Sequence, residues 1–316
     1  MCLSFCRQIL RGLSQCAFQA NEIAGALFVV AVAVFNWRTA ILFVASVVLG
    51  TLVARLLKGI DALTDLGLYG FNCGVMGLAL GSFFQPSPAL WVVAAVLAMA
   101  AAAVTVAMSK WVPFPFLAAP FILLFWLMWP FAESFGLSKV DFGAFPAMPV
   151  AWGSGISLTT IGSAFFSGTK LSGIIFLAGI AISNWRHALV AVIGAAVANA
   201  LADQAGVAGG LINAGLVGYN GVLAALAAYA IVAADLRLAV LGSLLATWFL
   251  SYVARNAPVP SLASGFVLAI WFILLLGWLN PRFAGKQPEP KTESIQGHSA
   301  ARSGFRFAQR RFPSPL

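Results

Sequence analysis

The feature that most constrains this chain is the length of its uncharged stretches. Between Asp65 and Lys110 lie 44 residues without a single Asp, Glu, Lys or Arg. Further uncharged stretches cover residues 142–169, 204–234, 238–254 and 256–281. Roughly 20 apolar residues in a helix cross a hydrocarbon core, so each stretch fits one or two helical spans. The runs are continuously apolar rather than alternating, which favours helices over a membrane β-barrel.

The composition supports a membrane protein and excludes several other classes. Of the 316 residues, 61% are hydrophobic and 9% are charged, whereas a soluble domain carries about 25% charged residues. A soluble enzyme, a nucleic-acid module and a disordered scaffold are therefore excluded. We predict an all-α integral membrane protein that resides in the lipid bilayer.

The net charge of +9 is concentrated at the carboxyl end of the sequence. Residues 281–316 hold seven basic and two acidic residues, and Pro, Ser and Gly fill the same tail. We predict that this tail is disordered and lies on the cytoplasmic side of the membrane. Contact of the tail with anionic lipid is the alternative interpretation of its charge. Nucleic acid is not expected as a partner.

Sliding the sequence against itself reveals an internal repeat. Asn-Trp-Arg at 36–38 recurs at 184–186, and Gly-Leu-Tyr-Gly-Phe-Asn at 67–72 recurs as Gly-Leu-Val-Gly-Tyr-Asn at 215–220. Both pairs are 148 residues apart, as are Phe18 and Phe166. Pro-Phe-Pro at 113–115 matches Pro-Val-Pro at 258–260 at an offset of 145. The sequence therefore predicts two homologous membrane repeats, residues 1–140 and 150–280, followed by the tail 281–316.

Each repeat contains six apolar segments. In the first repeat they cover residues 4–20, 23–35, 39–57, 66–84, 88–109 and 114–132. The first two are short or interrupted by polar residues, so we expect one of them to cross only half of the membrane. Five full spans per repeat would invert the second repeat relative to the first, and ten spans would return both termini to one face. Arg7 and Arg11 indicate that this face is cytoplasmic.

Inverted repeats with broken helices are typical of transporters, which hold their solute near the membrane midplane. A duplicated membrane protein with another task, such as an intramembrane enzyme, is the alternative. Catalytic groups are scarce, however: no paired carboxylates interrupt a span, and neither Gly-x-Ser-x-Gly nor His-Glu-x-x-His occurs. The four cysteines lack metal or disulfide spacing. We therefore expect no enzyme activity, no metal and no cofactor, and passive permeation of a neutral solute.

Uncharged polar residues near two phenylalanines are the candidate path. Gln15 precedes Phe18, and Ser163 precedes Phe166 at the equivalent positions of the second repeat. Amide and hydroxyl oxygens, together with free carbonyls at a broken helix, can replace the water of a polar solute. The two rings are expected to face each other across a pseudo-two-fold axis, with ordinary packing as the alternative. The glycine motifs are expected to allow close backbone approach, with Asn72 and Asn220 satisfying exposed backbone groups.

These motifs resemble those of the urea transporter family. The stretch Arg-Gly-Leu-Ser-Gln-Cys-Ala-Phe at 11–18 is similar to the opening signature of the family. The motifs at 67–72 and 215–220 resemble its Gly-Leu-x-Gly-Tyr/Phe-Asn element, which is present once per half. Residues 115–121 and 260–266 resemble its Pro-x-x-Thr-x-Pro-Phe element. The resemblance covers about residues 8–280.

The resemblance implies ten transmembrane helices and two re-entrant half-helices, assembled as a homotrimer with one pore per subunit in the inner membrane. It implies that urea moves down its gradient between paired aromatic rings along a series of oxygen atoms. By position, Gln15 corresponds to an amide that contributes to this series of oxygen atoms. Phe18 and Phe166 correspond to the aromatic rings, which form narrow slots for the solute. The resemblance also implies that the slots are bordered by four further residues, Phe71, Val75, Tyr219 and Leu223.

Five positions depart from the family pattern, of which Glu22 and Gly265 replace a Pro and three are polar positions of the site. Ala118 and Ala263 stand where the family has a Thr that contributes to the series of oxygen atoms, and Ser163 stands where the family has Gln or Glu. A lost buried polar partner costs roughly 1–3 kcal/mol. The solute is therefore urea or, alternatively, another small neutral molecule such as a short amide or ammonia. A non-transporting membrane sensor or partner protein, suggested by the basic tail, is the alternative from another class.

Overall fold

The computed structural model describes residues 2–279, and the predicted tail 281–316 lies outside the described residues. Its secondary structure is helical, apart from an isolated bridge between Phe84 and Lys139. The elements of the first group are α1 (Cys2–Ser14), η1 (Gln15–Ala17), α2 (Glu22–Phe35), α3 (Trp37–Leu56), α4 (Asp61–Asp65), α5 (Leu68–Phe83), α6 (Pro88–Trp111), α7 (Ala119–Met128), η2 (Trp129–Phe131) and η3 (Glu133–Phe135). The elements of the second group are α8 (Ser154–Ser163), α9 (Lys170–Ser183), α10 (Trp185–Gln204), α11 (Gly209–Asn213), α12 (Tyr219–Ala227), η4 (Ala228–Val232), α13 (Leu236–Asn256) and α14 (Ser264–Leu279).

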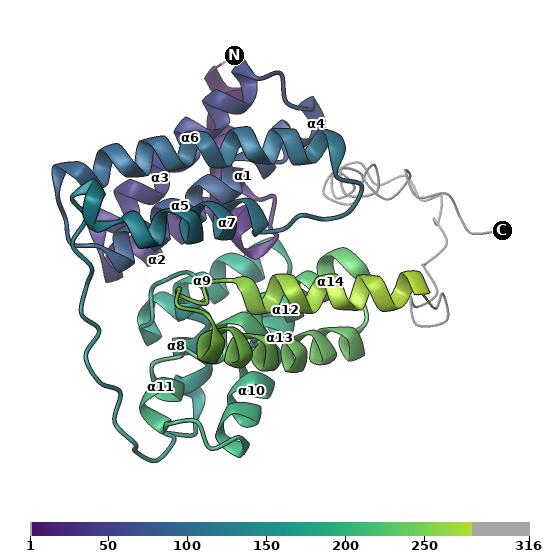
Figure 1. Ribbon diagram of the computed structural model, residues 1–316. Helices are drawn as coiled ribbons and strands as arrows, with labels where there is room; N and C mark the ends of the chain where they lie inside the picture. Colours follow the sequence, from purple (N-terminus) through teal and green to yellow (C-terminus); the bar gives the residue numbers. More distant parts are fainter. Residues whose placement is uncertain (1, 280–316) are drawn as a thin grey trace, which may run out of the picture.

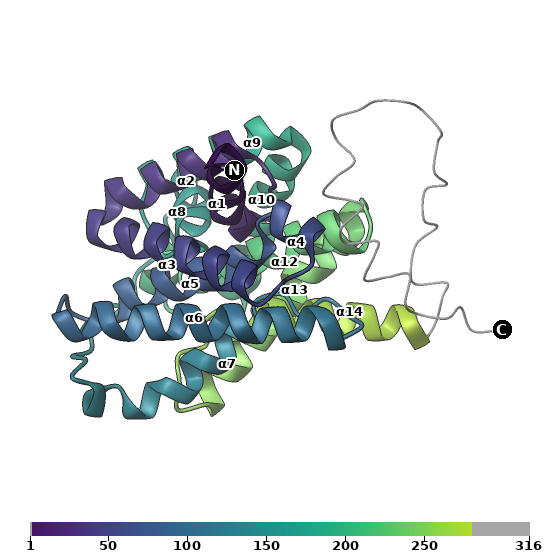
Figure 2. The same cartoon turned by 90° about the horizontal axis from the view of Figure 1, so that it is seen from above.

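The helices form two groups that follow each other in the sequence. Figure 1 shows α1–α7 in the upper half of the molecule and α8–α14 in the lower half. Residues 136–153, which contain no helix, connect the groups along the outside. In Figure 2, seen from above, α2 and α9 lie on one side of the molecule and α7 lies on the other.

Several of these helices are suited to a lipid environment. Within the described residues, α3, α6, α10 and α13 are long and apolar enough to cross a membrane, and α1 with α2 adds a fifth candidate bent by 68°. Five shorter apolar helices have 10–17 residues. On α6, Val92, Val96 and Met99 are exposed along one face, as lipid-facing residues would be, while Ala94 and Ala98 are buried on the other. The chain is thus an all-helical, multi-pass membrane protein.

Apart from the short α4 and η3, the helices of the first group fall on the predicted apolar segments, with one shift. The segment predicted at 114–132 becomes helical only at Ala119. Pro113 and Pro115 precede it, and proline restricts both its own backbone and that of the residue before it. Pro120 lies in the first turn of α7, where a missing N–H removes no helical hydrogen bond. The residues before α7 therefore form a loop.

The repeated Asn-Trp-Arg motif starts a helix in each group. The Asn36 side chain accepts hydrogen bonds from the backbone N–H of Arg38 and Thr39 at the start of α3, and Asn184 does the same for Arg186 in α10. Each Arg lies over the ring of the preceding Trp, which is exposed. The Asn therefore caps a helix, and the exposed Trp with its Arg suits the interface between lipid and water.

Equivalent residues meet where the two groups pack together. Phe28 of α2 and Phe176 of α9, which are 148 residues apart, have ring centroids 5.0 Å apart. Ser172 of α9 donates a hydrogen bond to the carbonyl oxygen of Ala31 in α2 at 2.9 Å. A helix pair with buried aromatic contact thus joins the groups.

Two tryptophans link the groups reciprocally. The Trp126 indole N–H donates to the carbonyl oxygen of Pro260 at 2.7 Å, and the Trp271 indole N–H donates to that of Pro115 at 2.8 Å. The two donors are 145 residues apart, and so are the two acceptors. Each group therefore holds the loop before the last α-helix of the other.

Candidate functional site

A short helix in each group ends in a left-handed turn at a phenylalanine. After α1 and η1, Phe18 has φ 59°, and its N–H donates to the carbonyl of Gln15 at 2.9 Å. After α8, Phe166 has φ 58°, and its N–H donates to the carbonyl of Ser163 at 3.1 Å. Left-handed termini of this kind end helices commonly, although glycine is their usual residue. A bulky residue there stores about 1–3 kcal/mol of strain, which is typical of functional sites.

A second pair of left-handed residues precedes α7 and α14. In the first group, Leu117 has φ 52°. The Asn72 amide donates to the carbonyl of Leu117 at 3.1 Å, and its oxygen accepts from the backbone N–H of Phe121 at 3.2 Å. Asn72 is fully buried. It therefore fixes the loop before α7 from 45 residues away. Asn72 does satisfy backbone groups, but the prediction that these belong to the glycine motif was wrong, because its partners lie in this loop and at the start of α7.

The second group repeats this arrangement with one addition. Leu262 has φ 46°, and the buried Asn220 bonds its carbonyl at 2.9 Å and the N–H of Phe266 at 2.8 Å. The hydroxyl of Tyr219 also donates to the carbonyl of Leu262 at 2.6 Å. Phe71 stands at the equivalent position of the first group and has no hydroxyl, so the carbonyl of Leu117 has one side-chain donor where that of Leu262 has two.

A narrow cavity lies where these four turns meet. The volume open to the centre of a water-sized sphere is about 20 Å³, enough for one or two such centres. Both groups supply its walls: Cys16, Phe18, Phe71, Val75, Leu78, Ala118, Ala164, Phe165, Phe166, Tyr219, Leu223, Ala263 and Phe266. We refer to this cavity as the slot. Its size fits a small solute stripped of most of its water.

The structure brings six of the eight predicted site residues to the slot. Phe18, Phe71, Val75, Phe166, Tyr219 and Leu223 all line it. Ala118 and Ala263, which stand where the family pattern has Thr, line the slot as well. Tyr219 is the only one of the lining residues with a side-chain oxygen or nitrogen, so the side chains of the slot are mainly apolar.

Gln15 and Ser163 are not among the residues that line the slot. The Gln15 amide donates to the carbonyl of Leu66 at 2.9 Å, and the Ser163 hydroxyl donates to the carbonyl of Ala214, also at 2.9 Å. Leu66 and Ala214 are 148 residues apart. Ser163 thus keeps the contact that Gln15 makes, although its side chain is shorter. Both contacts tie the short helix to the chain before the glycine motif of its own group.

The rings of Phe18 and Phe166 have partners other than each other. The Phe18 ring packs edge-on against Phe266, with centroids 6.0 Å apart, and the Phe166 ring packs against Phe83 at 6.3 Å. Each partner belongs to the other group. The expectation that these two rings face each other across a pseudo-two-fold axis stays a prediction, and among equivalent rings Phe28 and Phe176 are in direct contact. Both rings line the slot, and both residues lie in left-handed turns.

Two residues that line the slot have backbone carbonyls to which the described residues donate no hydrogen bond. Cys16 and Ala164 are equivalent residues of the two short helices, and both line the slot. The neighbouring carbonyls of Gln15 and Ser163 accept from Phe18 and Phe166. Within the described residues, no donor bonds the carbonyl of Cys16 or of Ala164, as expected where a helix ends.

Other chemistries have no counterpart in the described part of the chain. Residues 2–279 contain no group of three His, Cys, Asp or Glu side chains placed to hold a metal ion. Cys6, Cys16 and Cys73 are free thiols, of which Cys6 is exposed and the other two are buried. The ion pair closest in sequence to Phe18 joins Arg11 and Glu22, whose nitrogen and oxygen atoms are 2.9 Å apart, at the start of α2.

Sequence reasoning missed several residues of the site. Leu78, Phe165 and Phe266 line the slot, and nothing in an apolar segment distinguishes such residues from lipid-facing ones. Trp126 and Trp271 were also missed, although their equivalence at an offset of 145 is visible in the sequence. That signal, two tryptophans in register with the repeat, was available.

The fold and the site define an all-helical membrane protein in which two similar groups of helices enclose a narrow, aromatic-lined cavity. The sequence model described as "Urea transporter" matches residues 6–153 and 155–312. The chain belongs to the urea transporter family. It is 27% identical to "Urea transporter 1" of Rattus norvegicus over 311 residues, which covers 88% of this chain and 79% of the relative. It is 28% identical to "Urea transporter 1" of Ovis aries, with the same shares covered.

Proposed function

We propose that the chain is a passive urea channel whose conducting path runs through the slot. The observation that carries this proposal is the slot itself, which equivalent residues of both groups build in a member of the urea transporter family. No step of catalysis and no cofactor is assigned.

Two features of the slot would select a flat, neutral solute. Phe18 and Phe166 contribute rings whose apolar faces cannot replace the hydration shell of an ion, whereas a planar molecule fits against them. The carbonyls of Cys16 and Ala164 would accept hydrogen bonds from urea N–H groups, replacing part of its water. Passage would then be driven by the urea gradient, with no proton or ion coupled to it.

The proposed architecture has two inverted repeats, residues 1–140 and 150–280. In this arrangement α2, α3, α5, α6 and α7 span the membrane, as do α9, α10, α12, α13 and α14, while α1 and α8 are the half-helices. The contact of Phe28 with Phe176 supports a pseudo-two-fold axis, because equivalent residues meet on such an axis. The reciprocal bonds of Trp126 and Trp271 have the same symmetry.

We further propose that the protein is a homotrimer in the inner membrane, with one pore per subunit and both termini in the cytoplasm. Arg7 and Arg11 near the amino end support this orientation, since cytoplasmic segments are enriched in Arg and Lys.

Urea flux into proteoliposomes tests the proposal. The purified full chain should admit urea faster than empty liposomes, at the same rate with and without a proton gradient. Gln15→Ala, which removes the bond to Leu66, should lower the flux, whereas Gln85→Ala, in an exposed loop, should not. Flux equal to that of empty liposomes would remove the urea assignment.

A second candidate is the same channel with a different small neutral solute. Ala118 and Ala263 favour it, because they make the slot less polar than a Thr at either position would. A flux panel of urea, formamide, acetamide and ammonia separates the two candidates. A clear preference for urea would exclude the second, and a clear preference for another member of the panel would replace the first.

A further inference from the structure

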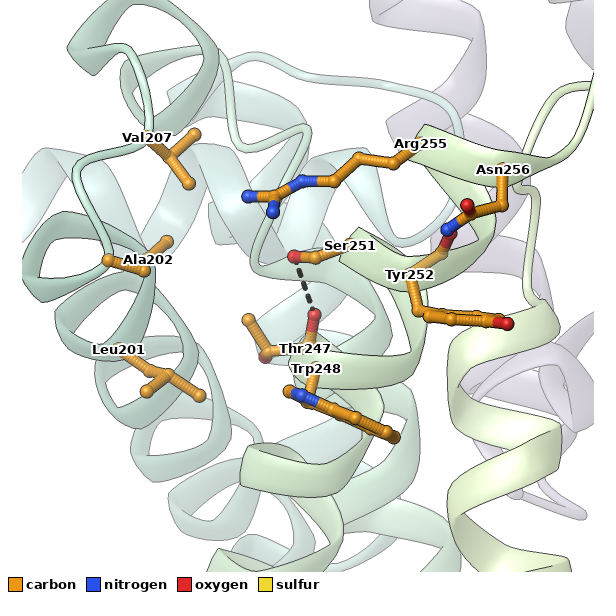
Figure 3. A pocket seen from close by; sticks show the side chains of 10 residues that line it. Leu201, Ala202, Val207, Thr247, Trp248, Ser251, Tyr252, Arg255 and Asn256 are labelled. Atoms are coloured by element: carbon orange, nitrogen blue, oxygen red, sulfur yellow. Dashed lines mark hydrogen bonds between the residues drawn. The ribbon is translucent and has the colours of Figure 1, made fainter.

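A groove separates α10 from α13 on the outside of the second group. It holds an open volume of about 450 Å³. Figure 3 shows Leu201 and Val207 on one side, and Trp248, Ser251, Tyr252 and Arg255 on α13. The Arg255 side chain extends across the groove toward Val207. The groove therefore has apolar walls and a cation at one end.

The corresponding region of the first group is filled. Tyr69 is buried there against Ala54 and Val106, and Val217 stands at its position in the second group. The Lys110 ammonium, the equivalent of Arg255, donates to the carbonyl of Leu57 at 3.3 Å and bridges the ends of α6 and α3. The groove thus results from a smaller side chain and an unbridged cation, both specific to the second group.

The rim of the groove has the chemistry of a membrane interface. Trp248 and Tyr252 are 60% and 59% exposed, and their rings stack with centroids 6.2 Å apart. Amphipathic aromatic rings of this kind are enriched at the level of lipid headgroups. Arg255 is exposed beside them and forms no ion pair within residues 2–279. On the neighbouring helix, the carboxylate of Asp203 accepts from the indole N–H of Trp152 at 3.2 Å.

We propose that this groove binds one anionic phospholipid. The acyl chain lies between α10 and α13 along Leu201 and Val207, and the phosphate pairs with the guanidinium of Arg255. Within residues 2–279, Arg255 has no acidic partner, and a phosphodiester supplies that negative charge. The phosphate oxygens match the planar arrangement of N–H donors on the guanidinium. The stacked rings of Trp248 and Tyr252 flank the headgroup.

Lipid binding by the purified, delipidated full chain tests this site. Native mass spectrometry measures the affinity for phosphatidylglycerol and for phosphatidylcholine with the same acyl chains. Phosphatidylglycerol should bind about tenfold more tightly, as one charge-assisted contact predicts. Arg255→Gln should remove that preference. Arg237→Gln, at the other end of the same helix, should preserve it.

A second variant separates the acyl-chain contact from the charge. Ala205→Trp, which places a large ring in the groove beside Val207, should lower the affinity for both lipids by a similar factor. Equal affinity of the wild-type chain for the two lipids would overturn the proposal, as would a preference that survives in Arg255→Gln. Loss of an oligomer in Arg255→Gln, with lipid affinities unchanged, would assign the groove to a second copy of this chain.

Discussion

The two buried asparagines that hold the loops at the slot should differ in their contribution to stability. Asn72→Ala removes one donor and one acceptor, and leaves the carbonyl of Leu117 and the N–H of Phe121 without a side-chain partner. Asn220→Ala removes the same two groups, but the carbonyl of Leu262 keeps its bond from the Tyr219 hydroxyl. The first substitution therefore leaves two buried groups unsatisfied and the second leaves one.

The magnitude follows from this difference. Each unsatisfied buried polar group costs about 1–3 kcal/mol, so Asn72→Ala should cost about 2–6 kcal/mol and Asn220→Ala about 1–3 kcal/mol. Both substitutions gain the same helix propensity, which cancels in the comparison. Phe71→Tyr introduces the hydroxyl that the first group lacks. In the Asn72→Ala background it should recover about 1–3 kcal/mol by bonding Leu117.

The assay is equilibrium unfolding of the purified chain in mixed micelles, followed by circular dichroism, with urea flux measured in parallel. We expect Asn72→Ala to lower the free energy of unfolding more than Asn220→Ala does, and the double variant with Phe71→Tyr to recover part of that loss. Equal losses for the two asparagines, or no recovery on adding Phe71→Tyr, would refute the reasoning about the Tyr219 hydroxyl.

Three further predictions concern local structure. Gly173→Ala should prevent folding, since its Cβ would overlap the backbone carbonyl of Leu158, and expression of monodisperse protein measures this. Asn184→Ala should cost about 1 kcal/mol by removing a helix cap, and a wild-type unfolding midpoint would contradict the role given to the repeated motif. Among single-cysteine variants, one that keeps Cys6 should react with maleimide in the folded state and one that keeps Cys73 should not; equal labelling rates would show that the packing around α5 is different.

Much of the fold was accessible from the sequence because lipid imposes a simple rule on a helix. The uncharged stretch after Asp65 predicted α5 and α6, and the apolar segment at 39–57 predicted α3. The start of α7 was predicted too early, because apolarity continues through Pro115 while helix formation does not. Hydropathy records the solvent around a residue and carries no information about its backbone angles.

The residues that line the slot were largely predictable from the sequence, and the contacts among them less so. The register of the repeat predicted that Phe18 and Phe166 belong to one site, and both line the slot, but it gave no sign of the direct contact between the equivalent rings of Phe28 and Phe176. Equivalent positions in the repeat indicate that two residues have similar surroundings. Only the packing of the helices decides which equivalent pair is in contact. The partner of Asn72 was likewise hidden, because a bond to a loop 45 residues away leaves no local pattern.

The central claim is that urea passes through the slot, and blocking the slot tests it most directly. Stopped-flow urea flux is measured in proteoliposomes that contain the wild-type chain, Ala118→Trp or Val92→Trp. Ala118 lines the slot, whereas Val92 is exposed on α6, so the same added ring enters the cavity in one variant and faces outward in the other. We predict fast flux for the wild-type chain and Val92→Trp, and flux at the level of empty liposomes for folded Ala118→Trp. Undiminished flux through Ala118→Trp would contradict the account.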